Sequence, residues 1–358
     1  MKKVLSLMLC MVVAFSLAAC GGDKKENTDA KEYTYEIAFL TPSSEISIDD
    51  EDRIEAAWNG VRQFAEEKGK TYKYYEAEKN DTKAQLARMK DAVDAGAKVI
   101  VTAGPEVKEA VAEAQQKYKD VKFIYLDGSL DEVADNCVTV RFNPLHAGFL
   151  AGYGAVVEGL GNLGYLADGK SAESVAYGYG FLQGANEAAS RFGRYAVIRY
   201  DYGTKDASAE EIGKVAKSWY DDGVRAIFTY GGDVFHGVKK EAEEADKVVI
   251  ASNASKDYDK TVITSARKCY EEAVGAQLQA VYDGTFKGGK SVYMSAKNDG
   301  VGLDMKKSEF QYFNKDMYNE IYKELAKGDL KVLSAKDAKT VDDLIKAKWL
   351  YYIRIDQE

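Results

Sequence analysis

The stretch from Asp94 to Val107 reads DAGAKVIVTAGPEV, and the stretch from Asp221 to Val234 reads DDGVRAIFTYGGDV. Aligned without a gap, the two copies share Asp, Gly, Ile, Thr, Gly and Val at matching positions. Each copy predicts the end of a helix at a glycine, an apolar strand, a glycine turn and the acidic first turn of another helix. A strand that is apolar throughout is typical of a parallel sheet buried on both faces. The repetition therefore predicts two similar lobes built on one topology.

Length and composition agree with this organisation. A chain of 358 residues fits about two domains, each large enough for a sizeable core. Three prolines, 46% apolar residues and 30% charged residues are typical of a soluble globular body. The 25 tyrosines outnumber the 13 phenylalanines, which favours wet surfaces where a ring needs a polar tip.

The first twenty residues have the pattern of a secretion signal. Lys2 and Lys3 precede an apolar run over Val4–Leu17, and Leu17-Ala18-Ala19-Cys20 resembles the cleavage site of bacterial lipoproteins. The resemblance implies that residues 1–19 are a signal peptide and that Cys20 becomes a lipidated N-terminus. A short transmembrane anchor is the alternative, but the segment is marginal for spanning and no second apolar stretch follows. We therefore expect a protein anchored by lipid on the extracytoplasmic face of the cell membrane.

The chain that follows the signal is acidic and begins with a polar segment. Removing residues 1–19 takes away Lys2 and Lys3 and no acid, so the formal charge falls from −9 to −11. A negative body argues against a nucleic-acid partner, whose phosphates need a basic face. Residues 20–32 hold almost no apolar side chain and predict a flexible tether.

Two cysteines remain in the folded body, because Cys10 leaves with the signal and Cys20 is lipidated. Cys137 and Cys269 each lie in or beside an apolar run, which favours two unpaired core thiols. A disulfide between them stays open as an alternative in an oxidising space.

Strands and helices alternate from Tyr35 onward. In the first lobe we expect strands at Glu36–Leu40, Thr71–Tyr75, Lys98–Thr102 and Lys122–Leu126, and helices at Arg53–Lys68, around Leu86–Val93, and at Glu106–Lys117. The alternating run Cys137–Phe142 predicts an edge or connecting strand, and the Gly- and Ala-rich Ala147–Gly159 a close-packed helix that leads out of this lobe.

The same plan recurs in the second half. We expect strands at Asn162–Leu166, Tyr195–Tyr200 and Lys247–Ala251, and helices at Tyr179–Phe192, Ala209–Asp221 and Asp316–Lys327. After Thr261–Thr264, a helix at Cys269–Tyr282 and a strand at Ser291–Ser295 are expected to return to the first lobe. The predicted first lobe is thus residues 33–145 plus 261–297, and the second 146–260 plus 298–358. The fold class is α/β, with two doubly wound, Rossmann-like lobes joined by hinge crossings.

Signals for catalysis, metals and cofactors are poor. His146 and His236 are the only histidines, and neither has a second His or Cys at ligand spacing. The sequence has no Walker loop, no Gly-x-Ser-x-Gly elbow and no Gly-x-Gly-x-x-Gly fingerprint. The acidic run Asp49–Asp52 lacks the spacing of an EF-hand loop, which favours a helix N-terminus over a calcium site. We expect a protein with no catalytic residues, no metal and no cofactor.

Several longer motifs carry a family resemblance. They are GAKVIVTAGPEVKEAVAEAQQKYKDVKFIYLDG, VRFNPLHAGFLAGYGAV, YGYGFLQGA, KSWYDDGVRAIFTYGGDV, VITSARK and NDGVGL, and the similarity runs from about Ile37 to Leu330. In this combination the chain resembles the basic membrane protein (BMP) family, lipoprotein solute receptors of ABC importers, several of which bind purine nucleosides. The resemblance implies a type I periplasmic-binding-protein fold, in agreement with the repeat.

The resemblance also implies a ligand site, from which this chain departs in part. Arg53 stands where the family places a Phe that stacks on the base, and Thr204 and Lys205 occupy the region of a second stacking Phe. An Arg plane stacks on a base and equally suits a carboxylate. Asn253 stands where the family tends to show an Asp that holds a ribose diol, and it offers hydrogen bonds without charge.

Other positions match the family. The expected ligand-binding set is Asp50, Arg53, Gly104, Asp127, Tyr179, Thr204, Gly231, Asn253 and Lys268. For Asp127 the alternative is a turn residue at a strand end, and for Lys268 a surface lysine. Tyr177, Tyr230 and Trp58 are further aromatic candidates, although tyrosines near strand ends more often pack in the core.

Together these observations predict a membrane-tethered receptor that closes its lobes on a nucleoside-like small molecule and delivers it to an ABC permease with its ATPase. Three alternatives remain open: a ligand sensor that signals to a membrane partner, a receptor for a sugar-like or anionic solute, and a hydrolase of nucleosides or sugars.

Overall fold

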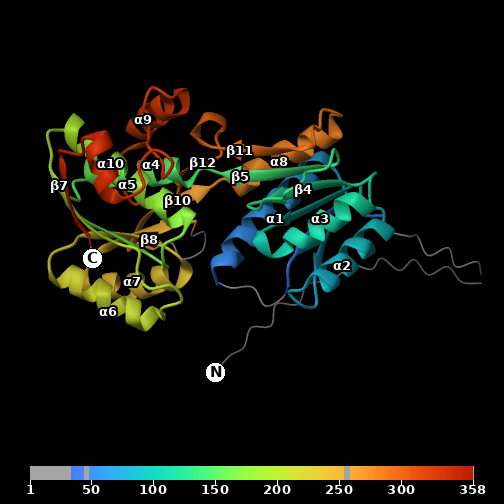
Figure 1. Cartoon of the computed structure of the whole chain (residues 1–358), viewed down its shortest axis with the longest axis horizontal. Coiled ribbons are helices and arrows are strands. Elements are labelled where there is room, and N and C mark those ends of the chain that lie inside the picture. Colours follow the sequence, from blue (N-terminus) through green and yellow to red (C-terminus); the bar gives the residue numbers. More distant parts are fainter. Residues whose placement is uncertain (1–33, 44–47, 254–258, 358) are drawn as a thin grey trace, which may run out of the picture. The chain divides into compact units, whose positions relative to one another are not determined.

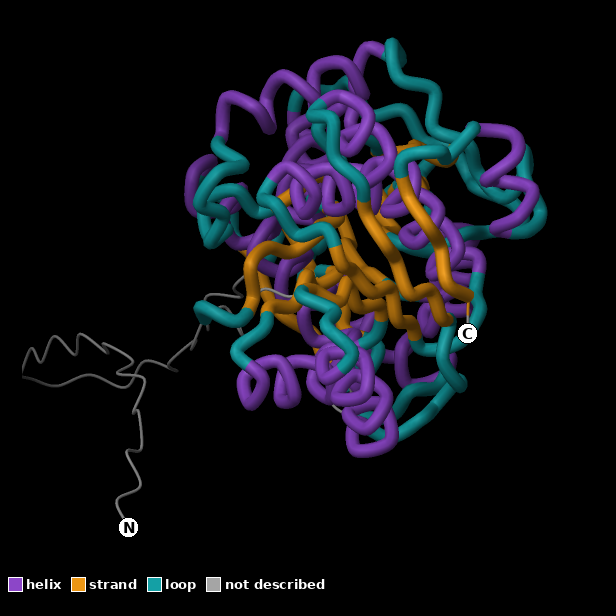
Figure 2. The backbone as a smooth tube through the Cα atoms, turned by 90° about the vertical axis from the view of Figure 1, so that its left-hand side faces the viewer, coloured by secondary structure: helices purple, strands orange, loops and turns teal. Residues whose placement is uncertain are grey.

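The computed structural model describes residues 34–43, 48–253 and 259–357, and it describes the side chains of 48–52 no further than their helix (Figure 1). Thr34–Glu358 forms one compact unit. Figure 2 shows its strands gathered in the middle with helices on both sides. None of the helices in the described ranges is long and apolar enough to cross a membrane.

The first sheet has six strands in the order β11-β5-β4-β3-β1-β2, and all of its pairs are parallel. Its strands are β1 (Ile37–Thr41), β2 (Tyr72–Glu76), β3 (Val99–Ala103), β4 (Lys122–Leu126), β5 (Cys137–Phe142) and β11 (Lys290–Met294). The connecting helices are α1 (Ile48–Lys68), α2 (Thr82–Asp94), the short η1 (Pro105–Val107), α3 (Lys108–Lys117) and α8 (Tyr270–Tyr282).

Both faces of this sheet are buried, as its apolar strands predicted. Ile37 and Phe39 of β1 pack with α1 and α8, whereas Ala38 and Leu40 pack with α2 and α3. This alternation follows from the two-residue period of a strand, which sends successive side chains to opposite faces.

The second sheet has seven strands in the order β12-β10-β9-β8-β6-β7-β13. Its strands are β6 (Asn162–Ala167), β7 (Ala196–Asp201), β8 (Ala226–Tyr230), β9 (Val248–Ser252), β10 (Val262–Lys268), β12 (Val301–Leu303) and β13 (Ile353–Gln357), and only β12 runs antiparallel to its neighbour. Its helices are α4 (Pro144–Val157), α5 (Ala172–Arg191), α6 (Ala209–Asp221), α7 (Gly232–Ala245), α9 (Lys315–Lys327) and α10 (Val341–Lys348), with the short η2 (Ala296–Asn298) between β11 and β12. The α/β class and the two-sheet plan are therefore confirmed.

The predicted repeat is confirmed at the level of the backbone. Asp94 and Asp221 are the last residues of α2 and α6. Gly104 (φ 104°, ψ 155°) and Gly231 (φ 110°, ψ 142°) then take nearly the same conformation after β3 and β8. Side chains with a Cβ rarely adopt this region, so both copies need glycine at the turn.

Helices α4 and α5 pack at unusually short range. A Cβ atom on Gly148 or Gly152 of α4 would lie 2.1 Å from the carbonyl oxygen of Tyr177 or Phe181 in α5. Gly180 and Gly184 of α5 make the reciprocal approach to α4. The close packing expected for Ala147–Gly159 is thus present, and α5 is held rigidly against the helix that follows β5 of the first sheet.

Three expectations about individual elements were wrong. The run Cys137–Phe142 is an interior strand between β4 and β11, and its polar Thr139 hydroxyl lies 2.7 Å from the Ser291 hydroxyl of β11, which explains the alternation without an edge. Helix α5 begins at Ala172 and not at Tyr179, because Ser171 accepts the N–H of Ser174 as an N-cap.

The third difference concerns β10. It pairs with β9 in the second sheet, whereas residues 261–297 were all expected in the first lobe. The return to the first sheet is made by α8 and β11 instead. The division into lobes otherwise stays a prediction. Cys137 and Cys269 are free thiols, as expected.

Candidate functional site

A buried lysine joins the two sheets. Lys268 is the last residue of β10, and its side chain is 3% exposed. Its ammonium lies 2.7 Å from a carboxylate oxygen of Asp127, which follows β4 of the first sheet. It also lies 2.5 Å from a carboxylate oxygen of Glu173, in the first turn of α5 beside the second sheet. One cation therefore links acids that belong to the two halves of the fold.

Asp127 is held by its backbone and by three polar contacts. It has φ 54°, a left-handed conformation that Asp and Asn tolerate better than most residues, and its N–H donates to the carbonyl of Val140. Its carboxylate accepts hydrogen bonds from Lys268 and, at 2.8 Å, from the hydroxyl of Tyr270. Burial raises the pKa of Asp127, but the charge and hydrogen bond of Lys268 outweigh it and leave the pKa below its ordinary value.

The same balance applies to the lysine. Burial lowers the pKa of Lys268, but the carboxylates of Asp127 and Glu173 raise it well above its ordinary value. The lysine is therefore charged throughout the physiological range, and the acid beside it is ionised.

Asn253 is the counterpart of Asp127 in the second sheet. It follows β9, has φ 56°, and its N–H donates to the carbonyl of Ala266. Its side-chain oxygen accepts the backbone N–H of Lys268 at 2.8 Å, and its amide nitrogen lies 3.3 Å from the hydroxyl of Tyr177. We call Asp127, Glu173, Asn253, Lys268, Tyr177 and Tyr270 the bridging cluster.

Arg53 lies close to this cluster in the first half of the fold. Its guanidinium forms an ion pair of 3.1 Å with Glu106, just after the first repeat turn. A Cβ on Gly104 would lie 2.5 Å from that guanidinium, so this glycine lets the arginine approach the turn. The charge of Arg53 is among the influences that lower the pKa of Asp127.

The bridging cluster presents polar groups of several kinds. It offers carboxylates, an ammonium, an amide and phenol hydroxyls, which suit a ligand with several hydroxyl groups. In the ranges that the structure describes, no group of three or more His, Cys, Asp or Glu could hold a metal ion. Burial lowers the pKa of His146 to about 4, so this histidine is neutral near pH 7.

The structure brings together some of the predicted site residues and not others. Lys268 contacts both Asp127 and Asn253, and Arg53 lies against Gly104. Gly231 packs against Asp168 at the corresponding end of the second sheet.

The other predicted residues have different surroundings. Tyr179 is buried within α5, and Thr204 is exposed in the turn after β7. The side chain of Asp50 lies outside the described residues. Trp58 packs against Phe39 and Tyr74 in the first core. A surface hollow along α9, between Asp316 and Lys327, contains no residue of the bridging cluster.

Two members of the cluster were not predicted from the sequence. Glu173 was not considered because α5 was expected to start at Tyr179. Ser171 and Ser174 form a capping box that marks the true start of the helix. Tyr270 follows Lys268 closely in the sequence, but nothing local indicates that its hydroxyl reaches Asp127.

Comparison with known proteins gives the family. The model of the family described as "Bmp: ABC transporter substrate-binding protein PnrA-like" matches residues 36–339. A protein named "CD4+ T-cell-stimulating antigen" from Listeria innocua is 28% identical over 92% of this chain and 98% of its own length. "Basic membrane protein D" of Borreliella burgdorferi is 25% identical over 64% of this chain and 67% of its own. An "uncharacterized lipoprotein" of Pyrococcus abyssi is 24% identical over 83% of this chain and 75% of its own.

Solved structures agree on the fold. A solute-binding protein of an ABC transporter system from Conexibacter woesei superposes with a TM-score of 0.71 at 17% identity, over 84% of this chain and 99% of its own. One from Aeropyrum pernix superposes with a TM-score of 0.67 at 18% identity, over 88% and 98%. The fold is that of the type I periplasmic binding proteins. With a family model that matches most of its length, the chain belongs to the PnrA-like substrate-binding proteins of ABC transporters.

Proposed function

We propose that this protein is a lipid-tethered receptor that captures a purine nucleoside outside the cell and passes it to the permease of an ABC importer. The observation that carries the proposal is the bridging cluster, in which Lys268 of the second sheet pairs with Asp127 of the first. Type I binding proteins bind their ligands between two such sheets, at the carboxyl ends of the strands. Asp127, Asn253 and Lys268 all stand at those ends.

The chemistry of the cluster supports a ligand with a vicinal diol. Asp127 can accept hydrogen bonds from two neighbouring hydroxyl groups, and Lys268 can donate to either oxygen. Asn253 adds an amide that donates and accepts. A ribose that enters here replaces hydrogen bonds that these residues now make to one another, so their polar atoms stay satisfied in both states.

The purine base of the proposed ligand needs planar side chains on which to stack. Tyr177 and Tyr230 lie beside each other with ring centroids 5.5 Å apart, next to Asn253. Arg53 offers a guanidinium plane from the first half of the fold. These groups stand in for the stacking phenylalanines that the family resemblance leads one to expect.

Closure of the two lobes is the proposed mechanism, and no chemical step accompanies it. The chain crosses between the sheets after β5, after β10 and between β11 and β12. A ligand that contacts Asp127 on one side and Asn253 on the other binds the closed form better than the open one, and so shifts the equilibrium toward closure. The permease then recognises the closed form.

Attachment to the membrane is proposed through Cys20. The Leu-Ala-Ala-Cys motif supports it, as do the names of two relatives, a lipoprotein and a basic membrane protein. The polar residues 20–32 would connect the lipid to the compact unit.

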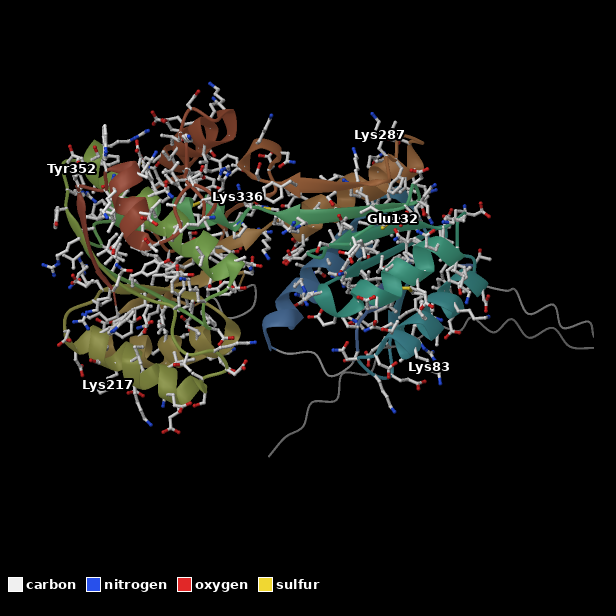
Figure 3. The ribbon with its side chains drawn as sticks, viewed as in Figure 1. Lys83, Glu132, Lys217, Lys287, Lys336 and Tyr352 are labelled. Atoms are coloured by element: carbon white, nitrogen blue, oxygen red, sulfur yellow. The ribbon has the colours of Figure 1, made fainter. Side chains whose placement is uncertain are left out.

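Calorimetric titration of the protein with inosine and guanosine tests the ligand class. We expect binding by the natural protein and at least tenfold weaker binding by Asp127→Asn, because a charged acceptor is replaced by a neutral one. Lys287→Met, which replaces an exposed lysine near the end of α8, is the control and should bind normally (Figure 3). Absence of nucleoside binding, with a sugar or an organic acid bound instead, would reject the nucleoside and keep the receptor.

A further inference from the structure

Seven large aromatic side chains are exposed in the part of the chain that the structure describes, and most of them gather in one region. Five surround the starts of β7 and β13 at the edge of the second sheet: Phe192, Tyr195, Trp349, Tyr351 and Tyr352. We call these five the aromatic patch. Tyr352 is labelled in Figure 3.

Strand pairing brings the members of the patch together. Ile353 of β13 pairs with Ala196 of β7, and both are buried. The residues just before them, Tyr352 and Tyr195, are therefore also opposite each other, and successive residues of a strand point to opposite faces, so both rings face solvent. The carbonyl of Tyr352 accepts the N–H of Ala196, which fixes this register.

The backbone conformation of Trp349 indicates that the exposure of its side chain is not incidental. Trp349 ends α10 with φ 54°, where glycine is the usual residue and a bulky side chain is strained. Its indole is nevertheless 69% exposed, so core packing does not explain why a tryptophan occupies the position.

The patch lies at the end of the second sheet opposite to the bridging cluster. β7, β8 and β9 run parallel, and the patch stands where strands begin, whereas Asn253 stands where they end. The aromatic patch is therefore not part of the ligand site.

Four cations near the patch form no short ion pair within the described residues. Lys331, Lys346, Lys348 and Arg194 form no ion pair with any carboxylate in the described ranges. Lys348 donates to the carbonyl of Lys331. The Arg194 guanidinium donates to the carbonyls of Val156 and Val157 at the end of α4 and lies 5.9 Å from the ring centre of Phe192. Among the nearby acids, Asp356 pairs with Arg354, and Asp337, which accepts the N–H of Ser334, lies within electrostatic range of Lys331.

We propose that the aromatic patch and its cations form a contact surface for anionic lipid headgroups. Tyrosine and tryptophan rings favour the headgroup region of a bilayer, and unpaired lysines and arginines are attracted to its negative charge. A second copy of the chain is a poorer occupant, because a symmetric contact sets these cations against themselves. The proposal goes beyond solute binding and describes how the body rests on the membrane.

The proposed tether is long enough for this contact. About 14 residues between Cys20 and Thr34 span at most about 50 Å when extended. A compact body of about 325 residues has a diameter of about 50 Å, so the anchor allows the second sheet to reach the bilayer.

The test uses the chain from Gly21 onward, which carries no lipid and keeps the whole compact unit Thr34–Glu358 with its own cores. It is mixed with vesicles of phosphatidylglycerol or of phosphatidylcholine, and binding is followed by co-sedimentation and by tryptophan emission. Trp219 is 1% exposed and Trp58 is half-buried, so Trp349 dominates any blue shift. We expect binding to phosphatidylglycerol that weakens with salt, and little binding to phosphatidylcholine.

Variants separate the contributions. Trp349→Gly should lose the blue shift and bind about tenfold more weakly, yet melt no lower, because glycine suits φ 54°. Lys346→Gln with Lys348→Gln should weaken binding roughly 30-fold, since each cation near an anionic surface is worth roughly fivefold. Tyr293→Ser is the matched control, because Tyr293 is 56% exposed but lies on β11 of the first sheet.

Two results would overturn the proposal. One is equal partitioning of the natural protein and Trp349→Gly into phosphatidylglycerol vesicles, including no binding by either. The other is concentration-dependent dimerisation that Trp349→Gly abolishes, seen by analytical ultracentrifugation without lipid, which would assign the patch to a second copy. Neither measurement involves a nucleoside, so failure here is distinct from failure of the proposed ligand.

Discussion

Replacing Lys268 with Met removes the cation between Asp127 and Glu173 and puts an apolar chain of similar length in its place. Removing one partner of a buried ion pair costs about 3–5 kcal/mol, because the other charge stays behind. Asp127 keeps its hydrogen bond from Tyr270, and the Glu173 side chain is 32% exposed and can turn toward water. We therefore expect the lower end, a loss of about 3 kcal/mol in the free energy of unfolding.

Chemical denaturation at pH 7 measures this loss, and thermal unfolding should show a decrease in Tm of roughly 4 °C for a compact unit of this size. Lys287→Met removes an exposed lysine and should change stability by less than about 0.5 kcal/mol. Adding Asp127→Asn to Lys268→Met should restore part of the loss, because the stranded carboxylate is gone. If Lys268→Met unfolds like the control, or if the second substitution restores nothing, the bridge contributes little and the reasoning fails.

The pH dependence follows from the direction of each shift. The pKa of Asp127 is lowered in the folded protein, so its contribution to stability is complete above its unfolded pKa of about 3.9 and is lost as pH falls through the lowered value. The pKa of Lys268 is raised, so its contribution is complete below its unfolded pKa of about 10.4 and is lost only as pH rises beyond it. The difference between the natural protein and Lys268→Met should therefore be largest at neutral pH and shrink as the pH falls, because the stranded Asp127 of the variant, whose pKa burial raises, takes up a proton at a higher pH than the paired Asp127 of the natural protein.

Further predictions test helix packing, ligand class, motion and anchoring. Gly152→Ala should destabilise the protein by about 1–3 kcal/mol in denaturant titrations, since its Cβ meets the Phe181 carbonyl; Gly275→Ala, with open space in α8, should be neutral or stabilising. Arg53→Phe with Asn253→Asp should tighten inosine binding about tenfold in calorimetry, and weaker binding would contradict the nucleoside pocket. Small-angle scattering should give a smaller radius of gyration with ligand bound, whereas an unchanged radius would argue against hinge closure. Cys20→Ser should abolish acylation and detergent-phase partitioning; a variant that is still processed and still partitions would refute the lipid anchor.

The sequence predicted the fold well where the signal is local. A helix stop, an apolar strand and a glycine turn lie within fourteen residues in each repeat, and the structure reproduces both copies down to the dihedral angles of Gly104 and Gly231. The placement of β10 was missed for the opposite reason. A buried strand has the same apolar sequence pattern whichever sheet it joins. Only the pairing of β10 with β9 shows that β10 belongs to the second sheet.

The site was predicted in part. Asp127 and Lys268 were expected from family motifs, but their contact spans 141 positions along the chain and no local pattern specifies it. The place of Glu173 in the first turn of α5 could have been predicted, because Ser171 is a typical N-cap residue and directly precedes the helix. Tyr179 was chosen where Tyr177 faces Asn253, since two tyrosines two positions apart cannot be assigned to opposite sides of a helix before its packing is known.

The matched left-handed turns at Asp127 and Asn253 have a consequence for how this scaffold can change its ligand. Asp and Asn are nearly the same size and both tolerate this backbone conformation. Exchange between them therefore alters the charge beside Lys268 by one unit without disturbing either strand end. Each half of the fold holds one such position, so single substitutions at the two positions give four combinations of Asp and Asn with three different net charges. In a binding protein built this way, substitutions at these two positions can change the preferred charge of the solute while the fold stays the same.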